Sequence, residues 1–143
     1  MEALEPILTA EAAAAFDALT RDGRDDLLVR QVEQAWPNVF RASRLTPAVE
    51  YINANRARTQ LMEAMDEALR DVDAYVHVGS DARSLRITNA TGHPTLIAPC
   101  GFRRDATPYS LCFTGKLYDE SRLLALGRAW QDSTAYHERH PEL

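Results

Sequence analysis

Three short segments of this 143-residue sequence have the composition of β-strands, and they limit the sheet that the chain can form. They are DAYVHV (73–78), PTLIAPCGF (94–102) and PYSLCFTGK (108–116). The last two are separated only by RRDAT, which predicts a β-hairpin. Pro99 has no backbone N–H, so we expect its strand at a sheet edge or at a bulge. Stable sheets have about four to six strands, so one edge of this sheet is expected to be open or completed by another chain.

Most of the remaining sequence has the periodicity and the end signals of helices, with threonine, proline, glycine and aspartate at the expected boundaries. The segment GSDARS (79–84) is expected to be a polar loop. The predicted helices run from Thr9 to Gly23, from Arg24 to Trp36 with Pro37 ending it, from Asn38 to Arg44, from Pro47 to Arg70, and from a cap at Asp119 to Glu138.

The order of these elements predicts one domain of the α/β class that covers residues 1–143, because no linker or repeat interrupts the chain. Residues 1–72 are expected to be mainly helical. Residues 73–143 are expected to hold the strand, the hairpin and the C-terminal helix. The predicted architecture is a partial mixed sheet of about three strands packed with several helices.

Charge and cysteine content exclude several kinds of partner and location. The net charge is -5 and the pI is near 5.3, which disfavours binding to nucleic-acid phosphates or to an anionic membrane. No apolar run approaches the roughly 20 residues that span a bilayer, and the acidic N-terminal segment is unlike a signal peptide. Two cysteines are too few for a disulfide scaffold. We therefore expect a cytoplasmic protein without a cofactor.

The basic residues are unusual, because fifteen of the sixteen are arginine and Lys116 is the single lysine. A hydrolase that uses serine and lysine needs the lysine close enough to accept the serine proton. The serines lie in neither an SxxK nor a GxSxG motif, and no two glycines are adjacent to form a loop for an oxyanion or a phosphate. The sequence therefore disfavours a complete Ser–Lys site, and we predict no catalytic residue.

The cysteines and histidines give only weak evidence for a catalytic or metal-binding site. Cys100 and Cys112 fall on the two hairpin strands, and we interpret them as small buried side chains that face each other; a disulfide or a reactive thiol is the alternative. His137 and His140 have a spacing that a metal could use, but no third ligand is near in sequence. We interpret this pair as a solvated helix end and predict no metal site. His93 either forms structural hydrogen bonds or lines a pocket.

His93 belongs to NATGHP (89–94), the densest group of polar and conformationally special residues in the chain. Gly92 permits backbone angles that other residues resist, and Pro94 fixes the entry into the next strand. Asn89 and Thr91 are suited to hydrogen bonds in a turn or short helix. Taken alone, these residues predict a sharply shaped loop and not a catalyst.

The same loop belongs to a longer pattern. The segment from Ile87 to Phe102, followed by Pro108 to Pro141, resembles the C-terminal end of amidase signature family hydrolases. In that family TNxTGxP leads into a strand with a PxGF-like turn, followed by G-x-x-(Y/F)-(D/E)-E and by a helix ending in A-(Y/W)-Q-x-x-T-x-x-H-x-x-(H/R)-P. The matching segments are Thr88–Pro94, Pro99–Phe102, Gly115–Glu120 and Ala129–Pro141. VEYINANRARTQLMEAMDEALRDVDAYV also resembles the helix and strand before them, so the resemblance covers most of the chain from about Leu8.

The resemblance implies a fragment of an α/β/α sandwich from a C–N hydrolase with a Ser–cisSer–Lys triad. The family's catalytic lysine and its Gly/Ser-rich segment lie upstream of the matched region, while Lys116 falls in the hairpin. No catalytic residue therefore carries over. Together with the family match, the loop is predicted to form the edge of a substrate-binding pocket whose catalytic partners are absent. The residues predicted for this edge are Asn89, Thr91, Gly92 and His93.

Three hypotheses follow for function. In the first, the chain is the C-terminal portion of an amidase-like hydrolase, from a truncated reading frame or a split enzyme, and needs an N-terminal amidase half. In the second, it is a stand-alone binding or oligomerisation module, derived from an amidase, that forms a homo-oligomer through a sheet edge. In the third, it is an autonomous hydrolase that uses Cys100, Cys112 or His93.

Overall fold

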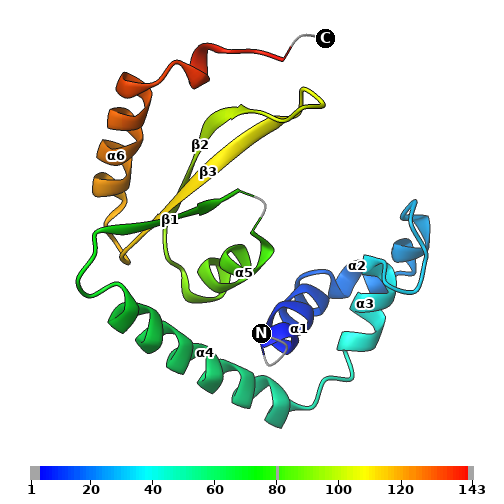
Figure 1. The fold of residues 1–143 in the computed structure, drawn as a ribbon. Helices are drawn as coiled ribbons and strands as arrows, with labels where there is room; N and C mark the ends of the chain where they lie inside the picture. The colour runs from blue at the N-terminus through cyan, green and yellow to red at the C-terminus, as the bar shows by residue number, and fades with distance from the viewer. Residues whose placement is uncertain (1–3, 80, 142–143) are drawn as a thin grey trace. The chain divides into compact units, whose positions relative to one another are not determined.

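The computed structural model describes residues 4–79 and 81–141, which form six α-helices and three β-strands (Figure 1). The chain divides into two compact units. We call residues 1–60 the helical unit and residues 61–143 the sheet unit. The boundary falls within helix α4 (Ala48–Ala68), which the sequence predicts nearly to its ends. No described helix is long and apolar enough to cross a membrane.

The helical unit begins with α1 (Glu5–Ala15), α2 (Asp17–Arg21) and α3 (Trp36–Ser43). The predicted cap at Thr9 is wrong, because α1 begins at Glu5 with a proline in its first turn, where the missing N–H removes no helix hydrogen bond. The Thr9 hydroxyl instead donates to the Glu5 carbonyl within the helix.

The predicted helix from Arg24 to Trp36 does not form. Only a single turn of 3-10 helix, η2 (Arg24–Leu27), follows the left-handed Gly23. The side-chain amides of Gln31 and Asn38 each donate to two backbone carbonyls of this segment, at 2.8–3.3 Å. These side chains compete with the backbone donors of a helix and hold the segment in an irregular path.

The sheet unit contains all three strands, and their pairing confirms the α/β class and the hairpin. The order is β1-β3-β2, and both pairs are antiparallel, so the sheet is not mixed as predicted. Helix α5 connects β1 to β2, and these two strands run in the same direction. Strand β3 lies between them and is antiparallel to both. The elements are β1 (Ala74–Val78), α5 (Ala82–Thr91), β2 (Thr95–Phe102), β3 (Pro108–Gly115) and α6 (Glu120–Ser133).

Pro99 marks both an edge strand and an irregularity, as its sequence context predicts. Strand β2 is at one edge of the sheet, and its register with β3 shifts between Pro99 and Gly101. Two other boundaries differ from the prediction. Helix α5 starts inside the predicted polar loop, because the Asp81 carboxylate accepts the Arg83 N–H and caps it. Helix α6 ends at Ser133 and is followed by the short 3-10 turn η3 (Tyr136–Glu138).

Helix α6 covers one face of the sheet, and α5 lies on the other side (Figure 1). The core beneath α6 is built from Ala98 and Phe113 of the strands and Leu123 of the helix. Two glycines allow this close packing. A Cβ at Gly127 would lie 2.7 Å from Leu96 Cδ1, and one at Gly115 would lie 3.0 Å from Leu123 Cγ.

Candidate functional site

The four predicted pocket-edge residues lie at the end of α5 and in the turn that leads into β2. Gly92 ends the helix in the left-handed conformation at φ +80°, and its N–H donates to the Thr88 carbonyl at 2.8 Å. Asn89 is exposed in the last turn of the helix. Thr91 and His93 are buried, with 1% and 5% of their surface exposed. The four residues are therefore neighbours, but only Asn89 and Gly92 are at the surface.

Thr91 and His93 form a buried pair that fixes which nitrogen of the imidazole carries the proton. The Thr91 hydroxyl donates its single proton to the Ile87 carbonyl at 2.9 Å. Its oxygen lies 2.8 Å from His93 Nδ1, so Nδ1 is the donor and Nε2 carries the lone pair. Burial lowers the pKa of His93, and the charge of Asp66 opposes this shift. The pair holds a neutral histidine behind the turn.

A second polar group crosses all three strands on the sheet face opposite α6. His77 Nδ1 lies 3.2 Å from the Val78 carbonyl, which can only accept, so Nδ1 donates. Nε2 lies 3.1 Å from the Thr114 hydroxyl, which lies 2.9 Å from the Thr95 hydroxyl. The three side chains thus form one continuous row of hydrogen bonds. Thr114 is fully buried, so this row joins β2, β3 and β1 inside the sheet unit.

Neither polar group presents a nucleophile to a substrate, because the Thr91 hydroxyl donates to the Ile87 carbonyl and Thr114 is fully buried. Lys116 lies after β3, and its Nζ donates to the Arg70 carbonyl at 2.9 Å. Ser84 donates to the Asp81 carboxylate and Ser133 to the Trp130 carbonyl. Within residues 4–79 and 81–141, no serine hydroxyl is hydrogen-bonded to Lys116. The described residues therefore do not bring a serine and a lysine together.

The two cysteines are free, and the prediction that they face each other is wrong. Cys112 pairs with Ile97 across the hairpin, while Cys100 occupies the bulge of β2. Burial raises the pKa of both thiols, which disfavours the nucleophilic thiolate. Over the described part of the chain, no group of three or more His, Cys, Asp or Glu side chains could hold a metal ion.

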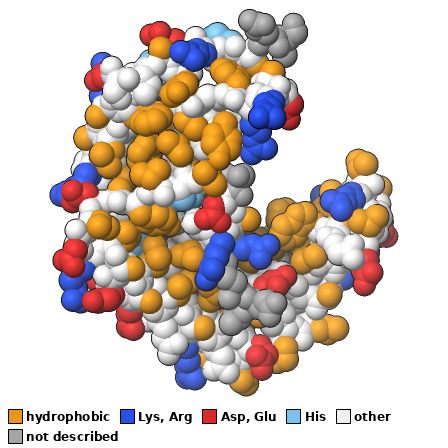
Figure 2. Space-filling view, in the orientation of Figure 1, with side chains coloured by type: hydrophobic (Ala, Val, Ile, Leu, Met, Phe, Trp, Pro, Cys, Tyr) orange, Lys and Arg blue, Asp and Glu red, His pale blue; other side chains and the backbone are white. Residues whose placement is uncertain are grey.

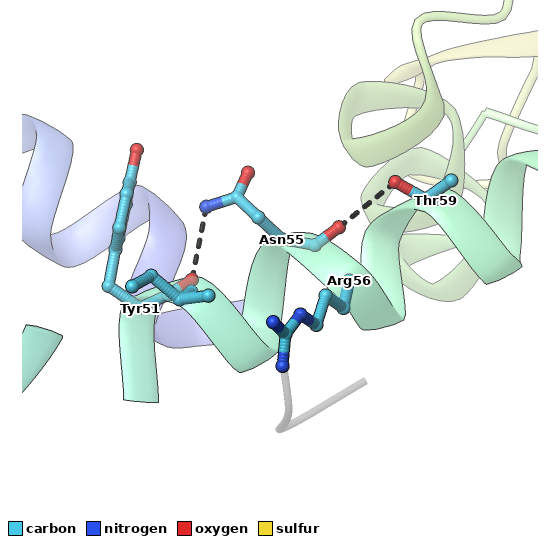
Figure 3. Close-up of a pocket in the computed structure, with 5 residues that line it drawn as sticks. Tyr51, Asn55, Arg56 and Thr59 are labelled. Carbon is cyan, nitrogen blue, oxygen red and sulfur yellow. Dashed lines mark hydrogen bonds between the residues drawn. The ribbon is translucent and has the colours of Figure 1, made fainter. Parts of the chain in front are cut away.

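The helical unit has a surface hollow of about 380 Å³ along one side of α4 (Figure 3). Within it, the Asn55 amide donates to the Tyr51 carbonyl and the Thr59 hydroxyl donates to the Asn55 carbonyl. Both side chains thus bond to their own helix. A second hollow, of about 440 Å³, lies over α1, α2 and α3, where Asp17 is paired with Arg21 and Arg44. Neither hollow is lined by the four predicted pocket-edge residues.

The sequence analysis does not identify the row of Thr95, Thr114 and His77. The sequence signal for this row is the alternation of side chains along each strand, which assigns every residue to one of the two faces of the sheet. The register that brings them together depends on pairing between distant segments, 19 residues apart for Thr95 and Thr114 and 37 for His77 and Thr114. The contact from Trp130 Nε1 to the Pro99 carbonyl, at 3.0 Å, is missed for the same reason.

Comparison with known proteins relates this chain to amidases. No protein family model matches it. A protein named amidase from Pseudomonas putida is 33% identical over 124 residues, which cover 69% of this chain and 26% of that protein. A glutamyl-tRNA(Gln) amidotransferase subunit from Chloroflexus aggregans is 44% identical over 64 residues, or 45% of this chain and 13% of the relative. The same subunit from Brevibacillus brevis is 22% identical over 111 residues, or 64% of this chain and 23% of the relative.

The fold agrees with these sequence matches. The crystal structure of an amidase family protein from Bacillus anthracis str. Ames superimposes with a TM-score of 0.66 over 92% of this chain and 26% of the other, at 19% identity. The chain thus spans about a quarter of the length of its longer matches, in agreement with the C-terminal region that the motifs indicate. From the sequence matches and the shared fold, we conclude that this chain belongs to the amidase signature family.

Proposed function

We propose that this chain is the C-terminal portion of an amidase-like hydrolase of C–N bonds and that it does not hydrolyse amides on its own. The observation that carries the proposal is the position of Lys116. Its Nζ donates to the Arg70 carbonyl at 2.9 Å, so the single lysine of the chain serves a structural contact. A Ser–Lys mechanism needs that amine beside a serine hydroxyl.

In the larger protein, the turn after α5 would form one edge of the substrate pocket. The exposed Asn89 amide and the exposed Gly92 backbone would face the substrate. Thr91 and His93 would hold the turn from behind, because they are buried and bonded to each other. The two free cysteines support a reducing compartment, and we place the protein in the cytoplasm.

The test is hydrolysis by the purified chain. Acetamide, hexanamide and benzamide would be assayed by ammonia release, and 4-nitrophenyl acetate by absorbance. We expect rates equal to those of buffer. Turnover that disappears in Lys116→Ala would overturn the proposal by revealing an internal Ser–Lys site. Turnover that disappears after thiol alkylation, or in His93→Gln, would overturn it in favour of an autonomous hydrolase of another type.

The DNA before the Met1 codon provides an independent test. A continuation, in frame or frameshifted, that encodes a Gly/Ser-rich amidase segment would support a truncated or split enzyme. Unrelated DNA, together with no separate gene for such a segment, would favour the second candidate function, a stand-alone binding module. The observation in favour of that module is the set of large apolar side chains that stay exposed on the sheet unit, among them Val76, Leu85 and Ile97.

A further inference from the structure

The two faces of the sheet differ in polarity. On the face that carries α6, hydrophobic side chains gather over the strands and the helix (Figure 2). The opposite face carries the row of His77, Thr114 and Thr95, which crosses all three strands. A polar group inside a sheet lowers stability unless its hydrogen bonds are made. The positions of the few protons in this row are therefore tightly constrained.

One nitrogen of the His77 ring has the same role in both charge states. Nδ1 lies 3.2 Å from the Val78 carbonyl oxygen, which can only accept, so Nδ1 carries a proton whether the ring is neutral or charged. A neutral imidazole has only one ring proton, so its Nε2 is then an acceptor, whereas Nε2 of the charged ring is a donor. Protonation of His77 therefore changes the role of a single ring atom, the one that faces Thr114.

Thr114 connects the two ends of the row. It is fully buried, and its hydroxyl oxygen lies 3.1 Å from His77 Nε2 and 2.9 Å from the Thr95 hydroxyl. A hydroxyl has one proton to donate. With a neutral His77, Thr114 donates that proton to Nε2, and Thr95 donates to Thr114. With a charged His77, Nε2 donates to Thr114, and Thr114 donates to Thr95.

The ends of the row, unlike its centre, are in contact with solvent. His77 and Thr95 are both half-buried, so the ring can exchange a proton with water and the Thr95 hydroxyl can turn from Thr114 to solvent. Thr95 also follows directly after Pro94, the last residue of the NATGHP segment. A change of charge on β1 therefore has a route to the first residue of β2, beside the predicted pocket edge.

We propose that His77 is a pH-sensitive switch whose protonation reverses the hydrogen bonds through Thr114 and turns the Thr95 hydroxyl outward. Histidine is the side chain that changes its charge between about pH 8 and 5. On charging, the ring takes one proton from water, and the Thr95 hydroxyl donates to water in place of Thr114; no covalent bond between heavy atoms changes. The inference is independent of the proposed function, because these hydrogen bonds and amide hydrolysis are measured separately and either can fail alone.

The titratable neighbours of His77 come from β1, β3 and the cap of α5. The Tyr75 ring stacks on the imidazole, with 5.4 Å between centroids. Cys112 lies opposite on β3, and burial raises the pKa of its thiol. The pKa of Asp81 is lowered, chiefly by the hydrogen bond from Ser84 and to a smaller extent by the charge of His77. The thiol and the carboxyl therefore keep their charges between pH 8 and 5, while His77 changes its own.

The test is an NMR titration of the isotopically labelled chain from about pH 8 to about pH 5. The nitrogen shifts of the His77 ring are expected to show a proton on Nδ1 alone at the upper end and on both nitrogens at the lower end. The side-chain carbon shifts of Thr95 and Thr114 are expected to change with the same midpoint as His77. Because His93 is close to Thr95 in sequence, the titration is repeated in His93→Asn, where the same coupling is expected.

Variants of the central threonine separate the row from a direct effect of charge. Thr114→Val keeps the shape of the side chain but removes the hydroxyl, so His77 is expected to titrate while Thr95 no longer follows it. Thr114→Ser is the matched control, because it keeps the hydroxyl and is expected to keep the coupling. His77→Gln removes the titrating group, and the shifts of Thr95 and Thr114 are expected to stay constant over the same range. Backbone amide spectra would verify that each variant folds.

Three results would overturn the proposal. The first is a neutral His77 whose proton is on Nε2, because Nε2 would then donate to Thr114 in both charge states. The second is a pair of threonines whose shifts stay constant while His77 titrates. The third is a Thr95 that follows His77 equally well in Thr114→Val, which would mean that the charge acts through space and not through the row.

Discussion

The two units of the chain are stabilised in different ways. In the sheet unit, Phe113, Ala98 and Leu123 meet between the strands and α6, and Gly127 lets the helix approach Leu96 closely. In the helical unit, the buried apolar residues are mostly alanines, with Phe40 stacked on Phe16 and Trp36 at 4.8 and 5.5 Å. The most buried of its described residues is Asp25, whose carboxylate group lies in a residue that is 2% exposed. One unit therefore depends on apolar fit, and the other on an ion pair between a half-exposed arginine and a buried carboxylate.

The largest effect is expected where the apolar fit is tightest. Leu123→Ala would remove a side chain that is 3% exposed, and it is expected to cost about 2–5 kcal/mol of unfolding free energy. The neighbouring Leu124 is 64% exposed, so Leu124→Ala is expected to change stability by less than about 0.5 kcal/mol. Urea unfolding, followed by circular dichroism, measures both. Equal costs for the two variants would contradict the packing described for α6.

A smaller effect is expected when Gly127, which lets α6 approach Leu96 of the sheet closely, is replaced. Alanine favours a helix over glycine by about 1 kcal/mol, so Gly127→Ala would stabilise an exposed helix. Here the new Cβ would lie 2.7 Å from Leu96 Cδ1, and we expect a net loss of about 1–3 kcal/mol instead.

The double variant Gly127→Ala with Leu96→Ala sharpens this test. If the clash is the cause, the two losses should be less than additive, because the second change makes room for the first. A stabilised Gly127→Ala variant would show that α6 does not rest on the sheet at this point.

The helical unit is expected to be sensitive to charge instead. Arg41 lies 2.6 Å from the buried Asp25 carboxylate, and it also contacts Asp26. Arg41→Ala would leave that carboxylate buried without its partner, at a cost of about 1–3 kcal/mol. Arg44 pairs with the more exposed Asp17, so Arg44→Ala is expected to cost less than about 1 kcal/mol. Chemical unfolding of both variants decides whether burial, and not the mere presence of an ion pair, sets the cost.

The two units also differ in how well the sequence predicts their elements. The hairpin is predictable because Pro99, the loop RRDAT and the alternating apolar residues are local signals, and they agree with the final register. The segment from Arg24 to Trp36 is not. Its apolar spacing suits a helix, but two side-chain amides, those of Gln31 and Asn38, occupy its carbonyls.

The candidate site is predictable only in part. Gly92 signals the end of α5 locally, and the structure places it there in the left-handed conformation. The structure buries Thr91 and His93 and leaves Asn89 exposed. This difference depends on how α5 packs, which the local sequence does not encode. The role of these residues at a pocket edge stays a prediction.

The smallest expected effect is the pH dependence that His93 contributes. Its folded pKa is lowered from the usual 6.5, chiefly by burial, so the unfolded chain binds a proton more readily than the folded one. Stability from this group is full above the unfolded pKa and is lost as pH falls below about 6.5 and on through the lower folded pKa. The lowered pKa values of Asp17, Asp81 and Asp105 act only near and below 3.8.

Above pH 5, the pH dependence of the unfolding free energy therefore reports on His93 and not on these aspartates. In His93→Asn, the amide can still donate to Thr91, but the titrating group is gone. We expect this variant to lose less unfolding free energy over the window than the wild type does, whatever its stability at neutral pH. The control is Asn89→Ala, which removes an exposed side chain that does not titrate and is expected to keep the wild-type slope. If the His93 variant also keeps that slope, the imidazole is not held neutral by burial, and water reaches the turn that Thr91 and His93 are proposed to hold from behind.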